Sequence, residues 1–287
     1  MQQAFVLPLE DSFVLPLEDS FVIRGDVHTT AGPGEKQPVL IFCHGFKGFK
    51  DWGSFPYVAD TLAAKNMTVI RFNFSANGVG ASLTEFDELE KFGINTYARE
   101  LSDLHVLMRA ILDRELPLAE HFDTEHIFVM GHSKGGGDSV LFGADHPAIK
   151  GIITWNGIAN VNLFDENVRQ EVKENGIAYM INGRTGQKMP ITPEVIEDVD
   201  QNAEAYDLVK KVSQLDKPLL IVQGEKDYGR LVQGAKRLKE AYPKAMLHWI
   251  GEADHVMNTR HPFTGTSAEL EEAIEVTAQF VLQNTQP

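Results

Sequence analysis

Residues 127–137 are Ile-Phe-Val-Met-Gly-His-Ser-Lys-Gly-Gly-Gly, and the segment 138–144 that follows them can form a helix. The apolar residues 127–130 are typical of a buried strand, and residues 131–135 fit the pattern Gly-x-Ser-x-Gly. A serine at an abrupt turn from a strand into a helix is a nucleophile elbow. The pattern therefore predicts that Ser133 presents its hydroxyl at such a turn.

The glycines around Ser133 have a physical reason. The serine of an elbow has a strained backbone, and the residues two before and two after it pack so closely that a side chain would collide. The hydroxyl then lies at a helix N-terminus, where backbone N–H groups and the helix dipole favour negative charge. We therefore expect an exposed serine hydroxyl in surroundings that stabilise an anion.

The composition favours one α/β domain over residues 1–287 with an insertion. With 287 residues and 43% hydrophobic content, the chain can bury a large core. The formal charge of −15 argues against a nucleic-acid partner and against docking on an anionic membrane, because both need a basic surface. We interpret the acidic excess as solvated surface.

Cysteine usage and the N-terminus bear on location. The single cysteine, Cys43, follows the apolar run 39–42 and is expected to be a small buried hydrophobe. The N-terminus lacks a basic region followed by a long apolar stretch, and no segment approaches the length of a membrane span. We therefore expect a cytoplasmic protein.

Residues 4–22 contain a tandem repeat. The octapeptide Phe5-Val6-Leu7-Pro8-Leu9-Glu10-Asp11-Ser12 recurs as residues 13–20, and Phe21-Val22 begin a third copy. Each unit has the pattern of a short strand that ends in a polar turn, and its proline removes one ladder donor. We expect an edge hairpin or a duplicated first strand, and a partner-binding edge is the alternative.

Strand and helix patterns alternate over most of the chain. Apolar runs predict buried strands, and apolar positions at helical spacing predict the helices between them. Strands are expected at 38–45, 67–74, 127–130, 149–156, 218–224 and 245–250, and helices at 55–66, 95–112, 138–144, 230–242 and 267–282, with 75–93 as a loop. This alternation implies a mainly parallel central sheet with helices on both faces.

The segment 157–216 interrupts the alternation. It carries no buried-strand signal, and its parts 166–174 and 194–212 are mostly polar and compatible with helices. Long structureless loops are rare in compact domains. We therefore expect this insertion to form a helical cap over a site.

Three chemically suitable side chains follow three predicted strands. Ser133 follows the elbow strand, Asp227 follows the strand 218–224, and His255 follows the last strand. In this interpretation Ser133 is the nucleophile, His255 takes and returns its proton, and Asp227 fixes the imidazole tautomer. Glu225 is the rival for the acid, whereas Asp254 is adjacent to His255 and badly placed to accept from the same ring.

An oxyanion hole is expected from two backbone N–H groups. One belongs to Lys134, the residue after the nucleophile, and the other to the loop after Cys43, most simply to Phe46. Because only backbone atoms are needed, the side chain at position 46 should matter less than its position suggests.

Four blocks of this sequence resemble the hallmark motifs of the α/β-hydrolase superfamily. They are residues 44–48 (His-Gly-Phe-Lys-Gly), 131–136 (Gly-His-Ser-Lys-Gly-Gly), 224–227 (Gly-Glu-Lys-Asp) and 253–255 (Ala-Asp-His). The resemblance is closest to bacterial serine hydrolases that are dienelactone-hydrolase-like, cinnamoyl (feruloyl) esterase-like or acylaminoacyl-peptidase-like, and it covers residue 37 to the C-terminus but not the repeat.

The resemblance implies hydrolysis of a carboxylic ester through an acyl-serine intermediate, a cap after the strand that ends near Trp155, and no cofactor. Dienelactone hydrolases proper use a cysteine where this chain has Ser133, which argues against that lactone chemistry.

Candidates for substrate binding come from the strand ends and the cap. We expect Trp155, Met180 and Met257 to line an acyl pocket, although such residues are often core. Arg184 is a candidate partner for a substrate carboxylate, and a solvated surface arginine is the alternative. Lys47, Lys50 and Asp51 are expected to form a solvated charge cluster near the site, with substrate steering as the alternative. No metal site is expected, because His121 and His126 do not match zinc spacing.

The residues together predict a serine esterase that acts on small to medium acyl or aryl esters. An aminopeptidase or acylaminoacyl peptidase and a thioesterase are alternatives on the same triad, and a ligand receptor without turnover is the alternative outside enzymes. The expected partner is a small-molecule ester, and the sequence leaves a homodimer open.

Overall fold

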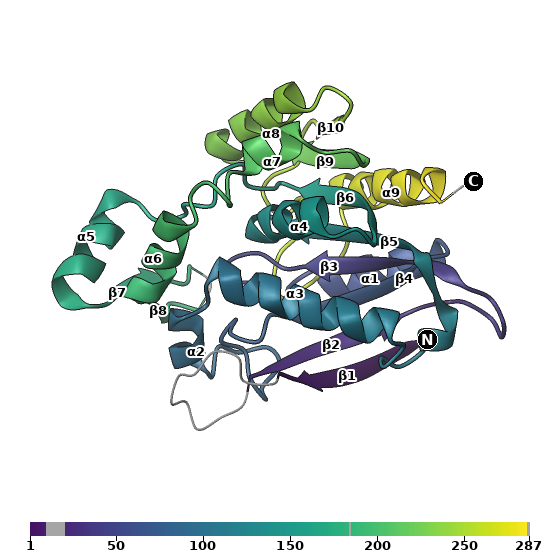
Figure 1. Ribbon diagram of the computed structural model, residues 1–287, viewed down its shortest axis with the longest axis horizontal. Helices are drawn as coiled ribbons and strands as arrows, with labels where there is room; N and C mark the ends of the chain where they lie inside the picture. The colour runs from purple at the N-terminus through teal and green to yellow at the C-terminus, as the bar shows by residue number, and fades with distance from the viewer. Residues whose placement is uncertain (10–20, 184, 286–287) are drawn as a thin grey trace.

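A central sheet organises the residues that the structure, a computed structural model, describes: 1–9, 21–183 and 185–285. Within these ranges the sheet has eight strands in the order β1-β2-β4-β3-β5-β6-β9-β10 (Figure 1). They are β1 (Gln2–Pro8), β2 (Val22–His28), β3 (Gln37–Cys43), β4 (Thr68–Asn73), β5 (Phe122–His132), β6 (Ile149–Trp155), β9 (Leu219–Gly224) and β10 (Met246–Ile250). The pairs β1–β2 and β2–β4 are antiparallel and the others are parallel, which confirms the predicted mainly parallel sheet.

Helices cover both faces of this sheet, as the alternation predicts. On β3, Val39 and Ile41 belong to one apolar cluster, whereas Leu40 and Phe42 belong to another on the opposite face. The first cluster includes residues of α3 (Tyr97–Leu112), α4 (Lys134–Asp145) and α8 (Gly229–Ala241), and the second includes residues of α1 (Phe55–Ala64) and α9 (Ala268–Gln283). The α/β fold class is therefore confirmed. No helix in the described ranges is long and apolar enough to cross a membrane.

Some element bounds differ from the predictions. Strand β5 begins at Phe122 rather than 127, because Phe122 and Asp123 already pair with β3 before a register shift. The segment 75–93, predicted as a loop, ends in the short helix α2 (Leu89–Gly93), and a 3-10 turn η1 (Ala119–His121) precedes β5. These elements are too short for a periodic apolar pattern to predict them.

Residues 5–8 of the first copy of the repeat lie in β1, at the edge of the sheet. Among the described residues strand β1 pairs only with β2, and Phe5 lies opposite Gly25, where an added Cβ would stand 2.3 Å from the phenyl ring. The phenyl ring of Phe5 therefore closes over a glycine and is buried. The second copy, residues 13–20, lies outside the described residues.

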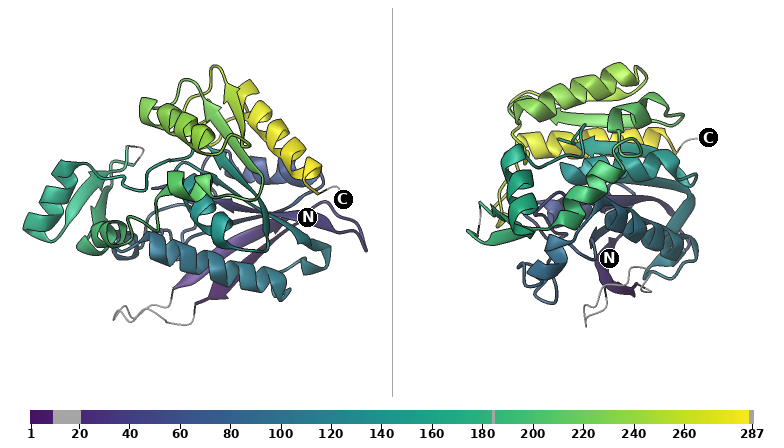
Figure 2. Two further views of the ribbon diagram at one scale, coloured as in Figure 1. Left: turned by 45° about the horizontal axis from the view of Figure 1, so that its top comes forward. Right: turned by 60° about the vertical axis from the view of Figure 1, so that its left-hand side comes forward.

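The insertion 157–216 contains strands as well as helices. It consists of α5 (Glu166–Asn175), β7 (Ala178–Ile181), β8 (Lys188–Ile191), α6 (Pro193–Gln201) and α7 (Leu208–Ser213). Strands β7 and β8 form a separate antiparallel pair, which the expected helical cap did not include. Figures 1 and 2 show α5, α6 and this hairpin to one side of the sheet near α2, whereas α7 packs against α4 and α8.

A third apolar cluster joins the insertion to the loops at one end of the sheet. Phe164, Met189 and Ile191 of the insertion share it with Phe49 and Phe92. The insertion is therefore held by apolar packing against the loop that follows β3.

Candidate active site

Ser133 lies between β5 and α4 in a strained conformation, with φ 57° and ψ −118°. The flanking glycines are required by space: a Cβ at Gly131 would stand 2.0 Å from the carbonyl oxygen of Gly135, and one at Gly135 would stand 2.4 Å from that of Cys43. Backbone atoms cannot move aside as a flexible side chain can. The turn thus has the predicted geometry of an elbow.

Three side chains form a hydrogen-bonded chain beside this elbow. The Nε2 atom of His255 is 3.1 Å from the Oγ of Ser133, and its Nδ1 is 2.9 Å from the Oδ1 of Asp227. The Asp227 side chain is fully buried, whereas 24% of the His255 side chain is exposed. Residues that are 122 and 28 positions apart in the sequence are thus brought into the arrangement that activates a serine.

Asp227 is held on both carboxylate oxygens. Its Oδ1 also accepts from the backbone N–H of Tyr228 at 2.6 Å, and its Oδ2 accepts from Nε2 of Gln223 at 3.0 Å. The rival Glu225 is exposed, and Asp254 accepts from two backbone N–H groups of its own turn. Asp227 is therefore the carboxylate that faces the imidazole.

Asn156, directly after β6, connects the acid loop and the base loop. Its Oδ1 accepts from the backbone N–H of Gly224 at 2.8 Å and from Nε2 of Gln223 at 3.0 Å. Its Nδ2 is 3.0 Å from the carbonyl oxygens of both Asp254 and His255. Asn156 is completely buried and has a positive φ of 47°, a conformation that asparagine tolerates better than most residues.

Two further histidines support the backbone around the site and are neutral. Nε2 of His132 lies 2.7 Å from the carbonyl oxygen of His255, and burial lowers the pKa of His132 to about 3. Burial likewise lowers the pKa of His44 to about 4. Because Nε2 of His44 accepts from the N–H of Phe74, its Nδ1–H donates to the carbonyl of Gly45. The two contacts of His44 connect the residue that follows β4 to the loop after β3.

A pocket of about 120 Å³ opens over Ser133. Apolar and aromatic side chains form much of its wall, as expected for a small-molecule site. Its lining residues are Gly45, Phe46, Lys47, Gly48, Trp52, Phe55, His132, Ser133, His255 and Val256. The backbone N–H groups of Phe46 and Lys134 donate to no acceptor in the described ranges, so both are free for a ligand.

The predicted substrate-binding residues are mostly elsewhere. Trp155 and Met257 are each 2% exposed in the core on the α1 and α9 side, and Nε1 of Trp155 donates to Thr277, so their assignment to the pocket was wrong. Met180, on β7, packs against the third cluster and does not line this pocket. Arg184 lies outside the described residues.

Two aromatic residues that line the pocket over Ser133 were not predicted. Trp52 precedes a predicted helix and Phe55 begins it, so neither carried a strand-end signal.

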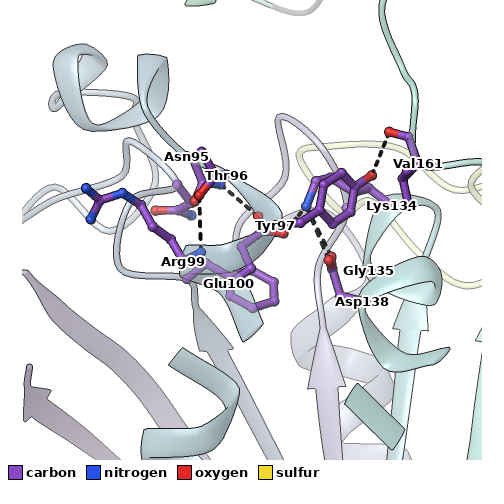
Figure 3. Close-up of polar contacts among 12 residues, drawn as sticks. Asn95, Thr96, Tyr97, Arg99, Glu100, Lys134, Gly135, Asp138 and Val161 are labelled. Atoms are coloured by element: carbon purple, nitrogen blue, oxygen red, sulfur yellow. Dashed lines mark hydrogen bonds and ion pairs between the residues drawn. The ribbon is translucent and has the colours of Figure 1, made fainter. Parts of the chain in front are cut away.

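Lys134 inserts its side chain into a buried ionic cluster (Figure 3). Its Nζ contacts the carboxylate of Glu100, lies 3.3 Å from Oδ2 of Asp138 and stands 3.8 Å from the centre of the Tyr97 ring. Burial lowers the pKa of Lys134 and raises that of Asp138. The residue whose N–H is proposed for the oxyanion hole is thereby anchored through its side chain.

The same cluster extends to the insertion. Oδ2 of Asp198, on α6, accepts from the backbone N–H of Tyr97 at 2.9 Å, and the Tyr97 hydroxyl donates to the carbonyl of Val161 at 3.1 Å. The sequence motifs do not predict this network. The four-residue spacing of Lys134 and Asp138 was a usable signal, whereas Glu100 is 34 residues away.

The charge cluster predicted near the site divides into two. Lys50 is not solvated, because it is only 7% exposed and binds Asp26 and Asp51 at 2.7 and 2.6 Å. Arg71 also contacts both carboxylates, so these residues form a buried structural network. Lys47 is separate from it and lines the pocket. No group of three or more His, Cys, Asp or Glu side chains in the described part of the chain is arranged to hold a metal ion.

The sheet, the elbow and the hydrogen-bonded chain define an α/β hydrolase. The fold is shared with Est1E from Butyrivibrio proteoclasticus, solved with ferulic acid bound, at a TM-score of 0.67 and 21% identity over 92% of this chain and 96% of that chain. The α/β hydrolase GrgF from Penicillium sp. sh18 matches at a TM-score of 0.70 and 14% identity, with 98% and 99% covered. Acylaminoacyl peptidase from Pyrococcus horikoshii matches at a TM-score of 0.65 and 15% identity, with 99% of this chain but 42% of that chain covered.

Residues 34–261 match the serine aminopeptidase family S33. This match spans most of the sequence, and the chain therefore belongs to that family. It is a serine hydrolase with the α/β-hydrolase fold, as the sequence motifs predict.

Proposed function

We propose that this protein is a serine carboxylesterase that cleaves small to medium acyl or aryl esters, including cinnamoyl-type esters, through an acyl-serine intermediate. The observation that supports an ester substrate most directly is the pocket over Ser133. Its described lining contains aromatic walls and no carboxylate. A pocket that binds the free amine of a peptide needs negative charge, because a buried ammonium must be paired.

The acylation step follows from the hydrogen-bonded chain. Oγ of Ser133 attacks the ester carbonyl while Nε2 of His255 takes its proton, and the buried carboxylate of Asp227 stabilises the imidazolium that forms. The carbonyl oxygen becomes an oxyanion that accepts from the backbone N–H groups of Phe46 and Lys134. The imidazolium then donates its proton to the leaving alcohol.

Deacylation uses the same groups in reverse order. Water enters beside Nε2 of His255, which removes its proton as the oxygen attacks the acyl carbon. The second oxyanion collapses, Ser133 leaves with the proton, and the carboxylic acid departs. His255 is neutral and Ser133 carries its proton again at the end of the cycle, so neither step needs a cofactor.

The volume of the pocket limits the group that it accepts. About 120 Å³ is somewhat less than the roughly 150 Å³ of an apolar cavity that holds benzene. We therefore expect short acyl chains to fit fully and a cinnamoyl ring to extend towards the pocket mouth.

Peptide hydrolysis is the second candidate, because the family is that of serine aminopeptidases and an acylaminoacyl peptidase shares the fold. An acylated N-terminus carries no ammonium, so the absence of a carboxylate in the described pocket lining does not oppose an acyl-peptide substrate.

A substrate panel tests the proposal. Turnover of p-nitrophenyl esters from acetate to decanoate, methyl ferulate, an aminoacyl anilide and an acylaminoacyl anilide is measured for wild type and Ser133→Ala. We expect the short esters to react fastest, the anilides to be left intact, and Ser133→Ala to lose at least about 10⁴-fold in kcat.

Labelling with a fluorophosphonate is the control for folded protein. Wild type should be modified at Ser133, and the variant should not. Cleavage of anilides alone would establish the peptidase, and a folded wild type that neither turns over nor labels would indicate a ligand receptor.

A further inference from the structure

Lys47 is the only lysine or arginine among the described residues that line the pocket over Ser133. The same lining contains no aspartate or glutamate, and His132 is held neutral by burial. The pocket therefore carries an excess of positive charge, in a chain whose formal charge is −15. The charge of the pocket is thus opposite in sign to the net charge of the chain, and a positively charged pocket attracts anionic ligands.

The Lys47 ammonium has no ionic partner in the described part of the chain. Its one hydrogen bond is to the backbone carbonyl of Ile181, on β7 of the insertion, at a long 3.3 Å. It also stands 5.5 Å from the centre of the Phe46 ring. By contrast Lys50, three residues away on the same loop, is bound by two carboxylates.

The surroundings of Lys47 strengthen any ion pair that it makes. The side chain is half-buried, and this desolvation lowers its pKa. The aromatic side chains of Phe46, Trp52 and Phe55 line the same pocket. An ion pair is stronger where water is displaced, since the effective dielectric constant is lower.

The backbone at Lys47 is also constrained. Its φ is 57°, in the left-handed region, and the next residue, Gly48, donates back to the carbonyl of Gly45 in a tight turn. This turn is part of the loop expected to supply an oxyanion donor from Phe46. The backbone of Lys47 is therefore held directly beside the expected oxyanion donor, so its side chain starts close to the reacting carbonyl.

We propose that Lys47 selects esters that carry a carboxylate, in the acyl or the alcohol part, by pairing its ammonium with that group. This inference rests on the proposed esterase function and specifies its substrate class. The substrate carboxylate replaces the long hydrogen bond to Ile181. Lys47 thus has the role that the sequence suggested for Arg184, that of a partner for a substrate carboxylate.

Two matched pairs of esters test the proposal. The first pair is mono-p-nitrophenyl adipate and its methyl ester, and the second is 4-carboxyphenyl butyrate and its methyl ester. The quantity measured is the ratio of kcat/KM for the anionic ester to that for its neutral partner. For Lys47→Met we expect this ratio to fall at least about tenfold in one pair, and for Lys47→Arg to be largely retained.

A charge-matched control removes a surface lysine outside the pocket. Lys210→Met, on α7, changes the net charge equally and should leave the ratio unchanged. Equal losses on neutral and anionic esters in Lys47→Met would overturn the proposal, because they would show that Lys47 only holds the insertion through Ile181. An unchanged ratio in both pairs would overturn it as well.

Binding to Ser133→Ala separates this proposal from the esterase proposal. Calorimetry with 4-carboxyphenyl butyrate and mono-p-nitrophenyl adipate compares Ser133→Ala with Ser133→Ala/Lys47→Met. If wild type cleaves no ester, the esterase proposal fails, while an affinity at least about tenfold lower without Lys47 still supports the anion site. Equal affinities overturn the anion site whatever the turnover.

Discussion

At the residue scale, Asn156 stands out because one side chain supports two loops. Its oxygen holds the backbone of Gly224 at the end of β9, three residues before Asp227, and its amide holds the backbone of His255. The distance between the acid and the base therefore depends on a group that touches neither the nucleophile nor the pocket. We regard Asn156 as a positioning residue.

Replacement of Asn156 by alanine tests this role. We expect kcat to fall on the order of 10- to 100-fold with little change in KM, because misplacing a catalytic group by a fraction of an ångström slows only the chemical steps. Steady-state kinetics on p-nitrophenyl butyrate, well below the melting temperature of the variant, provides the measurement. The exposed Asn160 serves for comparison, and a loss of stability at unchanged kcat would show that Asn156 is only structural.

At the element scale, the helices α3 and α4 are joined by one buried cation. Lys134 comes from the first turn of α4 and Glu100 from α3, and both side chains are at most 7% exposed. Removing one partner of a buried pair leaves an uncompensated charge, which costs far more than the loss of a surface pair.

We therefore expect Lys134→Met to lower the free energy of unfolding by about 3–5 kcal/mol. Adding Glu100→Gln should recover part of this loss, because it removes one of the stranded carboxylates. Urea denaturation measures both variants. Lys211→Met, which breaks a partly exposed pair with Asp145 between α7 and α4, should cost less than about 1 kcal/mol. Equal losses for the two lysines would contradict this account.

At the scale of the whole molecule, global stability should respond to pH through Asp103. Burial raises the pKa of Asp103 to about 7, although Ser75 donates to both of its oxygens. The folded chain thus keeps a proton that an unfolded aspartate releases near pH 3.9. This contribution to stability is complete below about pH 4 and is lost as the pH rises through about 7.

The neutral histidines act in the opposite direction. Because the pKa values of His44 and His132 are lowered to about 4 and 3, their contribution is present above about pH 6.5 and is lost on acidification. The wild-type profile combines both effects, so we compare it with Asp103→Asn. We compare the free energies of unfolding of the two proteins. Between pH 4 and 8 the value for Asp103→Asn should rise relative to that of wild type by up to about 4 kcal/mol. A difference that stays constant with pH in chemical denaturation would contradict the assignment.

The sequence predicts the fold well where apolar runs are long. The buried strands β3, β4, β6 and β9 were located to within one or two residues, because each contains a run of apolar residues between turns. The hairpin β7–β8 was missed, since its strands have only four residues each and three of the four residues of β7 are exposed or partly exposed.

The candidate site was predictable only in part, for a similar reason. Ser133, Asp227 and His255 occupy recognisable strand ends, and the structure brings them together. The pocket walls were not predictable. Trp52 lies in the loop after β3 and Phe55 at the start of α1, and the course of that loop decides whether they face the site. Trp155 follows the strand-end rule, yet the alternation of the strand turns it into the core.

The apolar contact between the insertion and the loop after β3 limits how this enzyme can be recombined with its relatives. The ring of Phe46 lies 5.4 Å from that of Phe92 and 5.9 Å from that of Phe164, so three separate segments meet at one aromatic cluster. A chimera that exchanged 157–216 alone would place foreign side chains against a native loop. The transplantable module is therefore discontinuous, and a grafted insertion must carry the residues at 46 and 92 with it.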